Sequence, residues 1–161
     1  MPGVATKGNK IQTSMTSNHI RIKKPNEYTC EPGYIGGEYY SGYWYGGVCY
    51  GVLTPPSSPY IYDNINGTID GEVNEGSSNV FVNGKAVGFS GAKTLEKDTY
   101  TVPNGWTVES GNHTSAHGSI TGGSSTVFVN GKPLVRNGDS ALTHANSTTK
   151  INEGSSNVFS N

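Results

Sequence analysis

One phrase that occurs three times constrains the fold of this chain more than any other feature. Residues 75–85 read EGSSNVFVNGK, residues 122–132 read GGSSTVFVNGK, and residues 153–161 read EGSSNVFSN. Three copies of one phrase predict three similar structural units, within a chain whose 161 residues suit a single domain.

Each copy has the sequence signature of a tight β-hairpin. In the first copy, the apolar run Val80-Phe81-Val82 is followed at once by Asn83-Gly84. This dipeptide is typical of a type I′ turn, because both central residues of that turn need a positive φ angle. The second copy repeats the arrangement around Asn130-Gly131. No window has the apolar period of a helix, so we predict an all-β fold of three hairpin repeats, each entered through a Gly-Ser-Ser turn.

The third copy stops at Asn161, where the Asn of its turn is expected. The N-terminal segment PGVATKGN, residues 2–9, matches PLVRNGD, residues 133–139, in its Pro, Val and Gly-Asn/Asp positions if one residue is inserted. We therefore expect the N-terminal segment to supply the return strand that the third copy lacks. The three units would then close into a ring with approximate threefold symmetry, and the two chain ends would meet.

A Tyr- and Gly-rich insertion at about residues 28–62 interrupts this repeated pattern. It holds nine of the ten tyrosines and ends in Pro55, Pro56 and Pro59. Two interpretations are open. The insertion is either an ordered loop that packs its rings against the rest of the protein, or a contact surface for another protein, since Tyr and Trp are enriched at interfaces.

The charge balance disfavours two classes of partner. The 11 Lys and Arg residues nearly cancel the 12 Asp and Glu residues, for a formal net charge of -1. This balance leaves no basic stripe for nucleic acid and no polybasic segment for an anionic membrane. No stretch approaches the roughly 20 apolar residues that span a bilayer.

The two cysteines, Cys30 and Cys49, both lie in the insertion. A disulfide, two free thiols and a thiolate metal ligand are all open. The N-terminal MPGVATKGNK has no apolar run that could serve as a signal peptide, so we expect synthesis in a cytoplasm. Free or buried thiols are then the favoured interpretation, because disulfides are rare in that compartment.

The four histidines form a candidate metal site. His113 and His144 each stand nine residues before the same point of a repeat, so a threefold arrangement would bring them together. The first repeat has Asn66 at this position, and we expect His19 to take its place. His117 is the candidate fourth ligand, with a cysteine as the alternative. Four protein ligands around zinc would make a structural site, although histidines without any metal role remain an equal alternative.

An enzymatic site receives less support. His113 and His117 have the i, i+4 spacing of a metallohydrolase helix, but the Glu that would act as the base is absent and the intervening residues are poor helix formers. We therefore expect a protein that is not an enzyme, with a metal-dependent hydrolase as a distant alternative.

Residues 123–139, GSSTVFVNGKPLVRNGD, resemble the repeat of the PAAR-domain proteins, with Pro133-Leu134-Val135-Arg136 where the family has Pro-Ala-Ala-Arg. MPGVATKGN at the N-terminus, EGSSNVFVNGKAV at 75–87 and EGSSNVF at 153–159 fit the same pattern. The resemblance covers about residues 1–20 and 64–161.

The resemblance implies a small conical fold with a triangular base and a sharp apex. Members of the family bind one zinc near the apex, usually through three His and one Cys. By position, His113 or His117 and His144 match the ligand loops of the family, whereas His19 matches less closely. No Cys stands in those loops, so we expect zinc on His19, His113, His117 and His144, with Cys30 or Cys49 as substitutes.

The resemblance also implies a mechanical function. Such proteins cap the trimeric β-helical spike of contractile phage tails and type VI secretion systems. We expect this chain to be a monomer by itself that sharpens a membrane-piercing tail spike and touches the bacterial outer membrane transiently. The expected partner is a homotrimeric tail spike or a VgrG-like spike protein, bound through hairpin edges near Asn83, Gly84, Asn130, Gly131 and Asn161. A place in the phage virion is favoured, with export by a type VI secretion system as the alternative.

Overall fold

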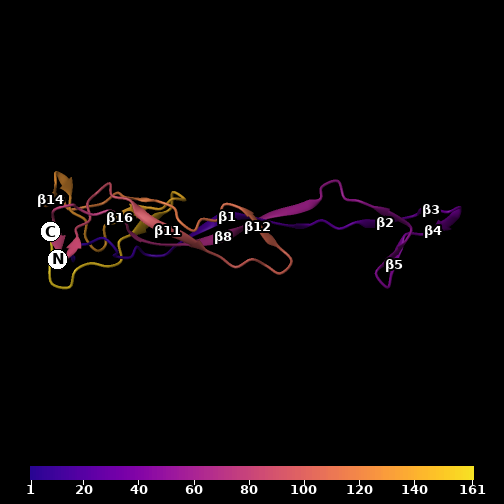
Figure 1. Ribbon diagram of the computed structural model, residues 1–161, viewed down its shortest axis with the longest axis horizontal. Coiled ribbons are helices and arrows are strands. Elements are labelled where there is room, and N and C mark those ends of the chain that lie inside the picture. The colour runs from indigo at the N-terminus through magenta and orange to yellow at the C-terminus, as the bar shows by residue number, and fades with distance from the viewer. The chain divides into compact units, whose positions relative to one another are not determined.

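A computed structural model describes residues 1–161 and consists of strands, turns and loops (Figure 1). The predicted all-β fold is therefore confirmed, and no helix is present that could span a membrane. The chain divides into two compact units. We call them the repeat unit, residues 1–21, 64–101 and 110–161, and the tyrosine-rich unit, residues 22–63 and 102–109.

The strands form several small antiparallel sheets rather than one large one. The largest has the order β11 (Thr94–Thr99), β8 (Tyr60–Val73), β1 (Ser14–Pro25) and β12 (Thr107–Ser110). A three-stranded sheet has the order β13 (Ser119–Ile120), β16 (Ser140–Leu142) and β17 (Thr148–Lys150). The remaining pairs are β9 (Phe81–Val82) with β10 (Lys85–Ala86), β14 (Phe128–Val129) with β15 (Lys132–Pro133), β2 (Thr29–Glu31) with β7 (Val52–Thr54), β3 (Gly33–Ile35) with β4 (Glu38–Tyr40), and β5 (Tyr43–Tyr45) with β6 (Val48–Tyr50).

The first two repeats form the predicted hairpins. Strands β9 and β10 are joined by Asn83 and Gly84, whose φ angles are 51° and 76°. Strands β14 and β15 are joined in the same way by Asn130 and Gly131, at 50° and 80°. Positive φ at both central positions is the condition of a type I′ turn, and Asn and Gly adopt it at least cost.

The N-terminal segment completes the third repeat, as the sequence predicted. Gly3 pairs with Phe159 in an antiparallel bridge, and the Val4 amide donates to the Val158 carbonyl at 2.9 Å. In the other repeats, the equivalent hydrogen bonds are donated by the Val87 amide to the Val80 carbonyl and by the Leu134 amide to the Val127 carbonyl, both at 3.0 Å. The two chain ends consequently lie side by side (Figure 1).

A closed circle of backbone hydrogen bonds joins the three repeats. The Ala5 amide donates to Val135 at 2.9 Å, the Val135 amide to Gly88 at 3.2 Å, and the Gly88 amide to Ala5 at 2.9 Å. Each repeat therefore donates one of these hydrogen bonds and accepts one. This pattern is the one expected from the approximate threefold symmetry that the sequence predicted. Around this circle lies a core of small and branched apolar residues: Ala5, Ile11, Val73, Ala92, Ile120, Val135, Ala141 and Ile151.

The tyrosine-rich unit contains the pairs β2–β7, β3–β4 and β5–β6. Its two inner hairpins turn at Gly36-Gly37 and Gly46-Gly47, all four with positive φ. Cys30 on β2 forms a disulfide with Cys49 on β6, across a Cα separation of 5.6 Å that suits such a bond. The prediction of free thiols is thus wrong, because the hairpins bring together two cysteines that stand 19 residues apart. Neither sulfur is available as a thiolate metal ligand, which removes Cys30 and Cys49 as substitutes.

Candidate metal centre

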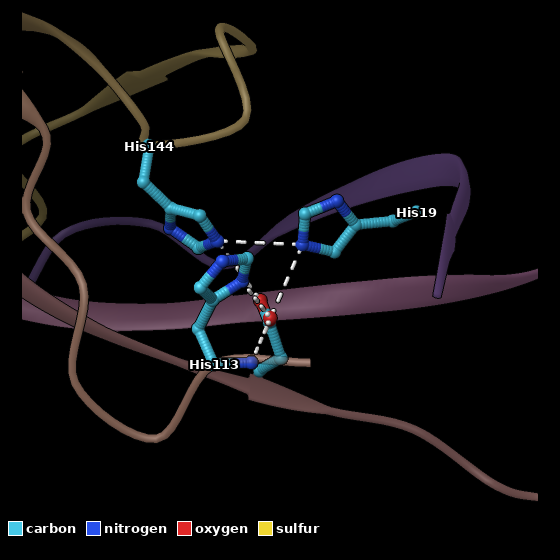
Figure 2. Close-up of side chains that lie close together, drawn as sticks. His19, His113 and His144 are labelled. Carbon is cyan, nitrogen blue, oxygen red and sulfur yellow. Dashed lines mark hydrogen bonds and ion pairs between the residues drawn. The ribbon is translucent and has the colours of Figure 1, made fainter. Parts of the chain in front are cut away.

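Three of the four histidines converge within the repeat unit (Figure 2). His19 lies on β1, His113 in the segment between β12 and β13, and His144 in the turn between β16 and β17. Asp98 on β11 completes the group, and the candidate ligand atoms of the four residues all lie within 4.8 Å of one another. Segments far apart in the sequence therefore present three imidazoles and one carboxylate to one point.

Asp98 is at the centre of the group. Its side chain is fully buried. Oδ2 accepts a hydrogen bond from the His113 amide at 2.8 Å, and it lies 3.0 Å from His113 Nδ1 and 3.1 Å from His19 Nε2. Burial by itself raises the pKa of this carboxyl. The hydrogen bonds from His113 and the nearby charges of His19 and His144 outweigh burial and lower the pKa of Asp98 below its ordinary value. The carboxylate is consequently held in the charged form that binds cations.

His144 is oriented by Glu96, a second buried carboxylate on the same strand. Glu96 Oε2 lies 2.6 Å from His144 Nδ1 and accepts the His144 amide at 2.8 Å, while Oε1 accepts the Thr94 hydroxyl at 2.8 Å. The short contact to a carboxylate places the ring proton on Nδ1. In a neutral imidazole with this tautomer, Nε2 would be the atom that can ligate a metal, and it lies 3.3 Å from His19 Nε2 and 3.2 Å from Asp98 Oδ1.

One buried acceptor of this group has no hydrogen bond. Asp98 Oδ1 is buried and without a hydrogen-bond partner, and His144 Nε2 lies 3.2 Å from it. A cation between these atoms would satisfy both, whereas a buried acceptor without a partner is costly. Three imidazole nitrogens and one carboxylate oxygen suit zinc, which takes four such ligands in structural sites. The residues present therefore fit a metal ion.

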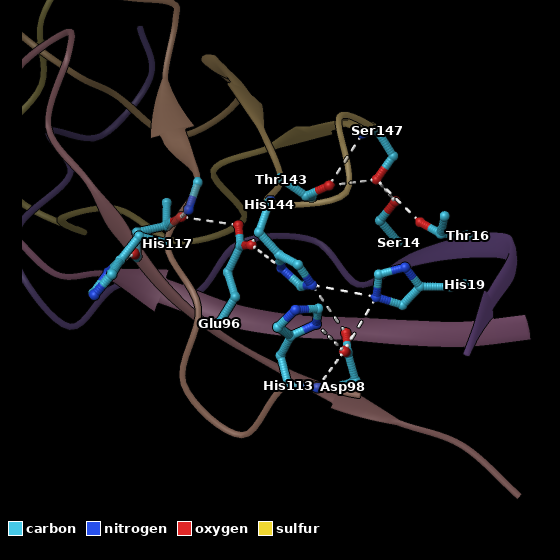
Figure 3. A network of polar contacts seen from close by, with 12 residues as sticks. Ser14, Thr16, His19, Glu96, Asp98, His113, His117, Thr143, His144 and Ser147 are labelled. Atoms are coloured by element: carbon cyan, nitrogen blue, oxygen red, sulfur yellow. Dashed lines mark hydrogen bonds and ion pairs between the residues drawn. The ribbon is translucent and has the colours of Figure 1, made fainter. Parts of the chain in front are cut away.

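The turn that carries His144 is tied to the start of β1 (Figure 3). The Thr143 amide donates to the Ser147 carbonyl at 2.9 Å, and the two side-chain hydroxyls lie 2.6 Å apart. The Ser147 hydroxyl also lies 3.0 Å from that of Ser14 on β1, the strand that carries His19. Hydroxyl contacts therefore hold two of the three imidazole-bearing segments together.

Two glycines make room for His19. A Cβ atom on Gly67 would lie 2.9 Å from Cδ2 of the His19 ring, and one on Gly111 would lie 2.6 Å from the His19 carbonyl oxygen. Gly111 also has a φ angle of 87°, which favours glycine. These positions allow the chain to pack closely around the ring and the backbone of His19.

His117 is not a member of this group. Its Nδ1 lies 2.8 Å from the Thr94 carbonyl oxygen, a contact that explains its orientation without a metal (Figure 3). The structure thus brings together His19, His113 and His144 from the predicted set, with Asp98 at the position that sequence reasoning assigned to His117 or a cysteine. The sequence carries one signal that could have indicated Asp98. Side chains alternate between the two faces of a strand, so Glu96 and Asp98 stand on one face of β11 and Lys97 on the other.

Comparison with known proteins supports the sequence resemblance. The family model described as the PAAR motif matches residues 110–161, which include His113, His144 and the second and third repeats. No curated protein and no solved structure matches the chain. Residues 110–161 of this chain therefore carry a PAAR motif, within a unit of three hairpin repeats that the N-terminal segment closes.

Proposed function

We propose that this protein is the structural tip of a spike in a contractile injection system. The PAAR motif supports this assignment, since the resemblance implies proteins that cap a trimeric β-helical spike. The single observation that carries the proposal is an apolar surface repeated three times. A monomer with internal threefold symmetry can bind all three subunits of a trimer alike.

The repeated surface consists of two apolar side chains from each hairpin. Phe81, Phe128 and Phe159 occupy the same position in the three repeats and are 57%, 56% and 48% exposed. Val80, Val127 and Val158, one residue earlier, are 36%, 37% and 36% exposed. Similar exposure in all three repeats favours a threefold partner, because exposed apolar residues that recur by symmetry are typical of a binding surface.

Polar contacts between neighbouring repeats hold this surface in shape. The Asn83 side chain donates to Asn157 Oδ1 at 2.8 Å, and the Asn130 side chain donates to Asn79 Oδ1 at 3.0 Å. In the third junction, the Ser124 hydroxyl donates to the Asn161 carbonyl. Each repeat therefore contacts the next one in turn, and the expected edges near Asn83, Asn130 and Asn161 lie at these junctions.

A zinc ion on His19, His113, His144 and Asp98 is part of the proposal. The ion would link two strands and two connecting segments, and the free energy of its binding would stabilise a fold with a small core. Four protein ligands leave no open position for a substrate, so the proposed role of the metal is structural. The protein is accordingly proposed to be mechanical rather than catalytic.

Within this class, we propose a phage tail spike tip in the virion rather than a type VI secretion tip. The tyrosine-rich unit supports this choice, because exposed rings such as Tyr34 and Tyr45 suit contacts with neighbouring tail proteins. Tail genes on either side of the coding sequence would support the phage assignment, and a secretion gene cluster would contradict it.

The test of the tip function is binding to the trimeric spike protein encoded in the same genome. Mixed and separated by size exclusion with light scattering, the two proteins are expected to form a complex of one chain per trimer. A variant with Phe81→Glu, Phe128→Glu and Phe159→Glu is expected to lose the complex. Met15→Glu is the matched control, because Met15 is also an exposed apolar residue of the repeat unit, at 68%.

A complex of three chains per trimer would contradict the proposal, as would unchanged binding by the triple Phe variant. Circular dichroism of that variant checks that the charges have not unfolded the repeat unit.

A further inference from the structure

The disulfide lies in a part of the chain that has almost no buried side chain. Among residues 28–62, only Gly51 is buried, while Tyr34, Tyr39 and Tyr45 are 73%, 60% and 72% exposed. Apolar burial is the main favourable contribution to folding, so these residues gain little from it. Something other than an apolar core must order this segment.

Its strands are also too short to be stable alone. The pairs β2–β7, β3–β4 and β5–β6 each have three residues per strand. An isolated two-stranded hairpin is marginally stable at best in water. The three pairs therefore need a link between them.

The centre of the segment is occupied by the disulfide and by backbone. A Cβ atom on Gly51 would lie 2.3 Å from the Glu31 carbonyl oxygen and 3.3 Å from Cys30 Sγ. One on Gly42 would lie 2.6 Å from Pro32 N. The chain segments cross so closely at this point that only glycine fits, and the Cys30–Cys49 bond joins β2 of the outer pair to β6 of the inner hairpin.

We propose that residues 28–54 are ordered only when Cys30 and Cys49 are joined, so that oxidation switches this segment from a disordered to a folded state. The two thiols lose two electrons and two protons to a protein or low-molecular-weight disulfide, which is reduced to two thiols. The reducing cytoplasm keeps the cysteines apart, and an oxidising environment closes the bond. This inference does not depend on the proposed spike function.

One consequence concerns the surface of the segment. A shallow groove is lined by Tyr34, Ile35, Trp44, Val48, Val52 and Leu53, and Cys49 is part of its wall. Because these residues come from different hairpins, the groove exists only in the oxidised form. Any binding at this surface is therefore restricted to oxidising conditions.

The test is hydrogen–deuterium exchange of the full chain before and after reduction by a phosphine. Peptides from residues 28–54 are expected to exchange at least about tenfold faster after reduction, because local unfolding exposes their amides. Peptides from residues 119–151 of the repeat unit are expected to keep their protection. Equal exchange of residues 28–54 in both states would overturn the proposal. Loss of protection in both regions would also overturn it, because the disulfide would then stabilise the whole chain rather than this segment.

A matched variant separates reduction of the bond from other effects of the phosphine. Cys30→Ser with Cys49→Ser is expected to show fast exchange in residues 28–54 without reductant and no further change when reductant is added. If this variant does not fold, the reduction of the native protein still decides the question.

Discussion

The repeat unit and the tyrosine-rich unit are both built from short hairpins, yet they are stabilised in different ways. In the repeat unit, hairpins with Asn-Gly turns close into a circle around buried residues such as Val135 and Ile151. In the tyrosine-rich unit, hairpins with Gly-Gly turns leave their side chains exposed and are joined by one disulfide. The two units therefore order short strands in two ways, by cyclic closure around a small core and by a covalent bond.

The largest effect is expected from opening the circle of the repeat unit. Deletion of residues 1–9 removes the return strand of the third repeat together with buried Val4 and Ala5. The free energy of unfolding should fall by more than about 5 kcal/mol, which is the lower end of typical domain stability. The repeat unit should therefore not fold. Scanning calorimetry of the truncated chain would show no cooperative transition.

The control for this deletion keeps every residue but changes the order of the chain. A circular permutant that joins Asn161 to Met1 by a short Gly-Ser linker, and opens in the exposed turn at Asn104-Gly105, should fold with a melting temperature close to that of the native chain. A truncated chain that unfolds cooperatively at the native temperature would show that closure by the N-terminus is not needed.

The next largest effect is expected at the metal centre. Elemental analysis of the native protein should give close to one zinc per chain that resists dialysis. His144→Ala and Asp98→Asn should each weaken binding by more than the roughly 10–100-fold that loss of an outer-shell partner costs. Both variants should also melt at a lower temperature, because metal binding contributes folding free energy.

His117→Ala distinguishes the two possible sets of ligands. If Asp98 completes the site, this variant should retain its zinc, because His117 contacts the Thr94 carbonyl instead. Zinc loss in His117→Ala with full retention in Asp98→Asn would support four histidines and contradict the group seen in the structure.

A pair of core substitutions sharpens the contrast between the two units. Ile151→Ala in the repeat unit should cost about 2–5 kcal/mol, because Ile151 is 1% exposed and its loss leaves a cavity. Leu53→Ala in the tyrosine-rich unit should change stability by less than about 0.5 kcal/mol, because Leu53 is 52% exposed. Urea unfolding of the oxidised protein measures the loss of stability in both variants. An equal loss in the two variants would mean that the two units have the same kind of core.

A smaller effect than that of Ile151→Ala is expected at a turn of the repeat unit. Asn83→Ala should cost roughly 1–2 kcal/mol, since Ala lacks the short polar side chain that lets Asn adopt a positive φ at lower cost. Asn83→Gly keeps the turn and removes only the side-chain bonds to Ser155 and Asn157. Urea unfolding that shows equal costs for the two variants would assign the whole effect to those bonds rather than to the backbone.

The parts of the fold that could be predicted are those encoded by adjacent residues or by repetition. The Asn83-Gly84 and Asn130-Gly131 turns follow from local rules, since positive φ selects those residue types. Completion of the third repeat followed from the match between the N-terminal segment and residues 133–139. His113 and His144 could be paired because they occupy the same place in two repeats.

Asp98, Glu96 and the disulfide could not be predicted in the same way. Glu96-Lys97-Asp98 reads as an ordinary charged strand, because carboxylates are seldom buried without a partner, and the partners come from segments distant in sequence. The expectation of synthesis in a cytoplasm favoured free thiols, and only the approach of β2 and β6 brings the two Cα atoms to a separation of 5.6 Å.

The sequence by itself determined three hairpins, their closure by the N-terminus and the pairing of His113 with His144, because turn conformations and repeat equivalence can be recognised from local patterns of residues. Only the tertiary structure decided that Asp98 rather than His117 joins those histidines, and that the cysteines bond to each other. Both outcomes depend on where long connecting segments return, a long-range property that no local pattern of residues contains.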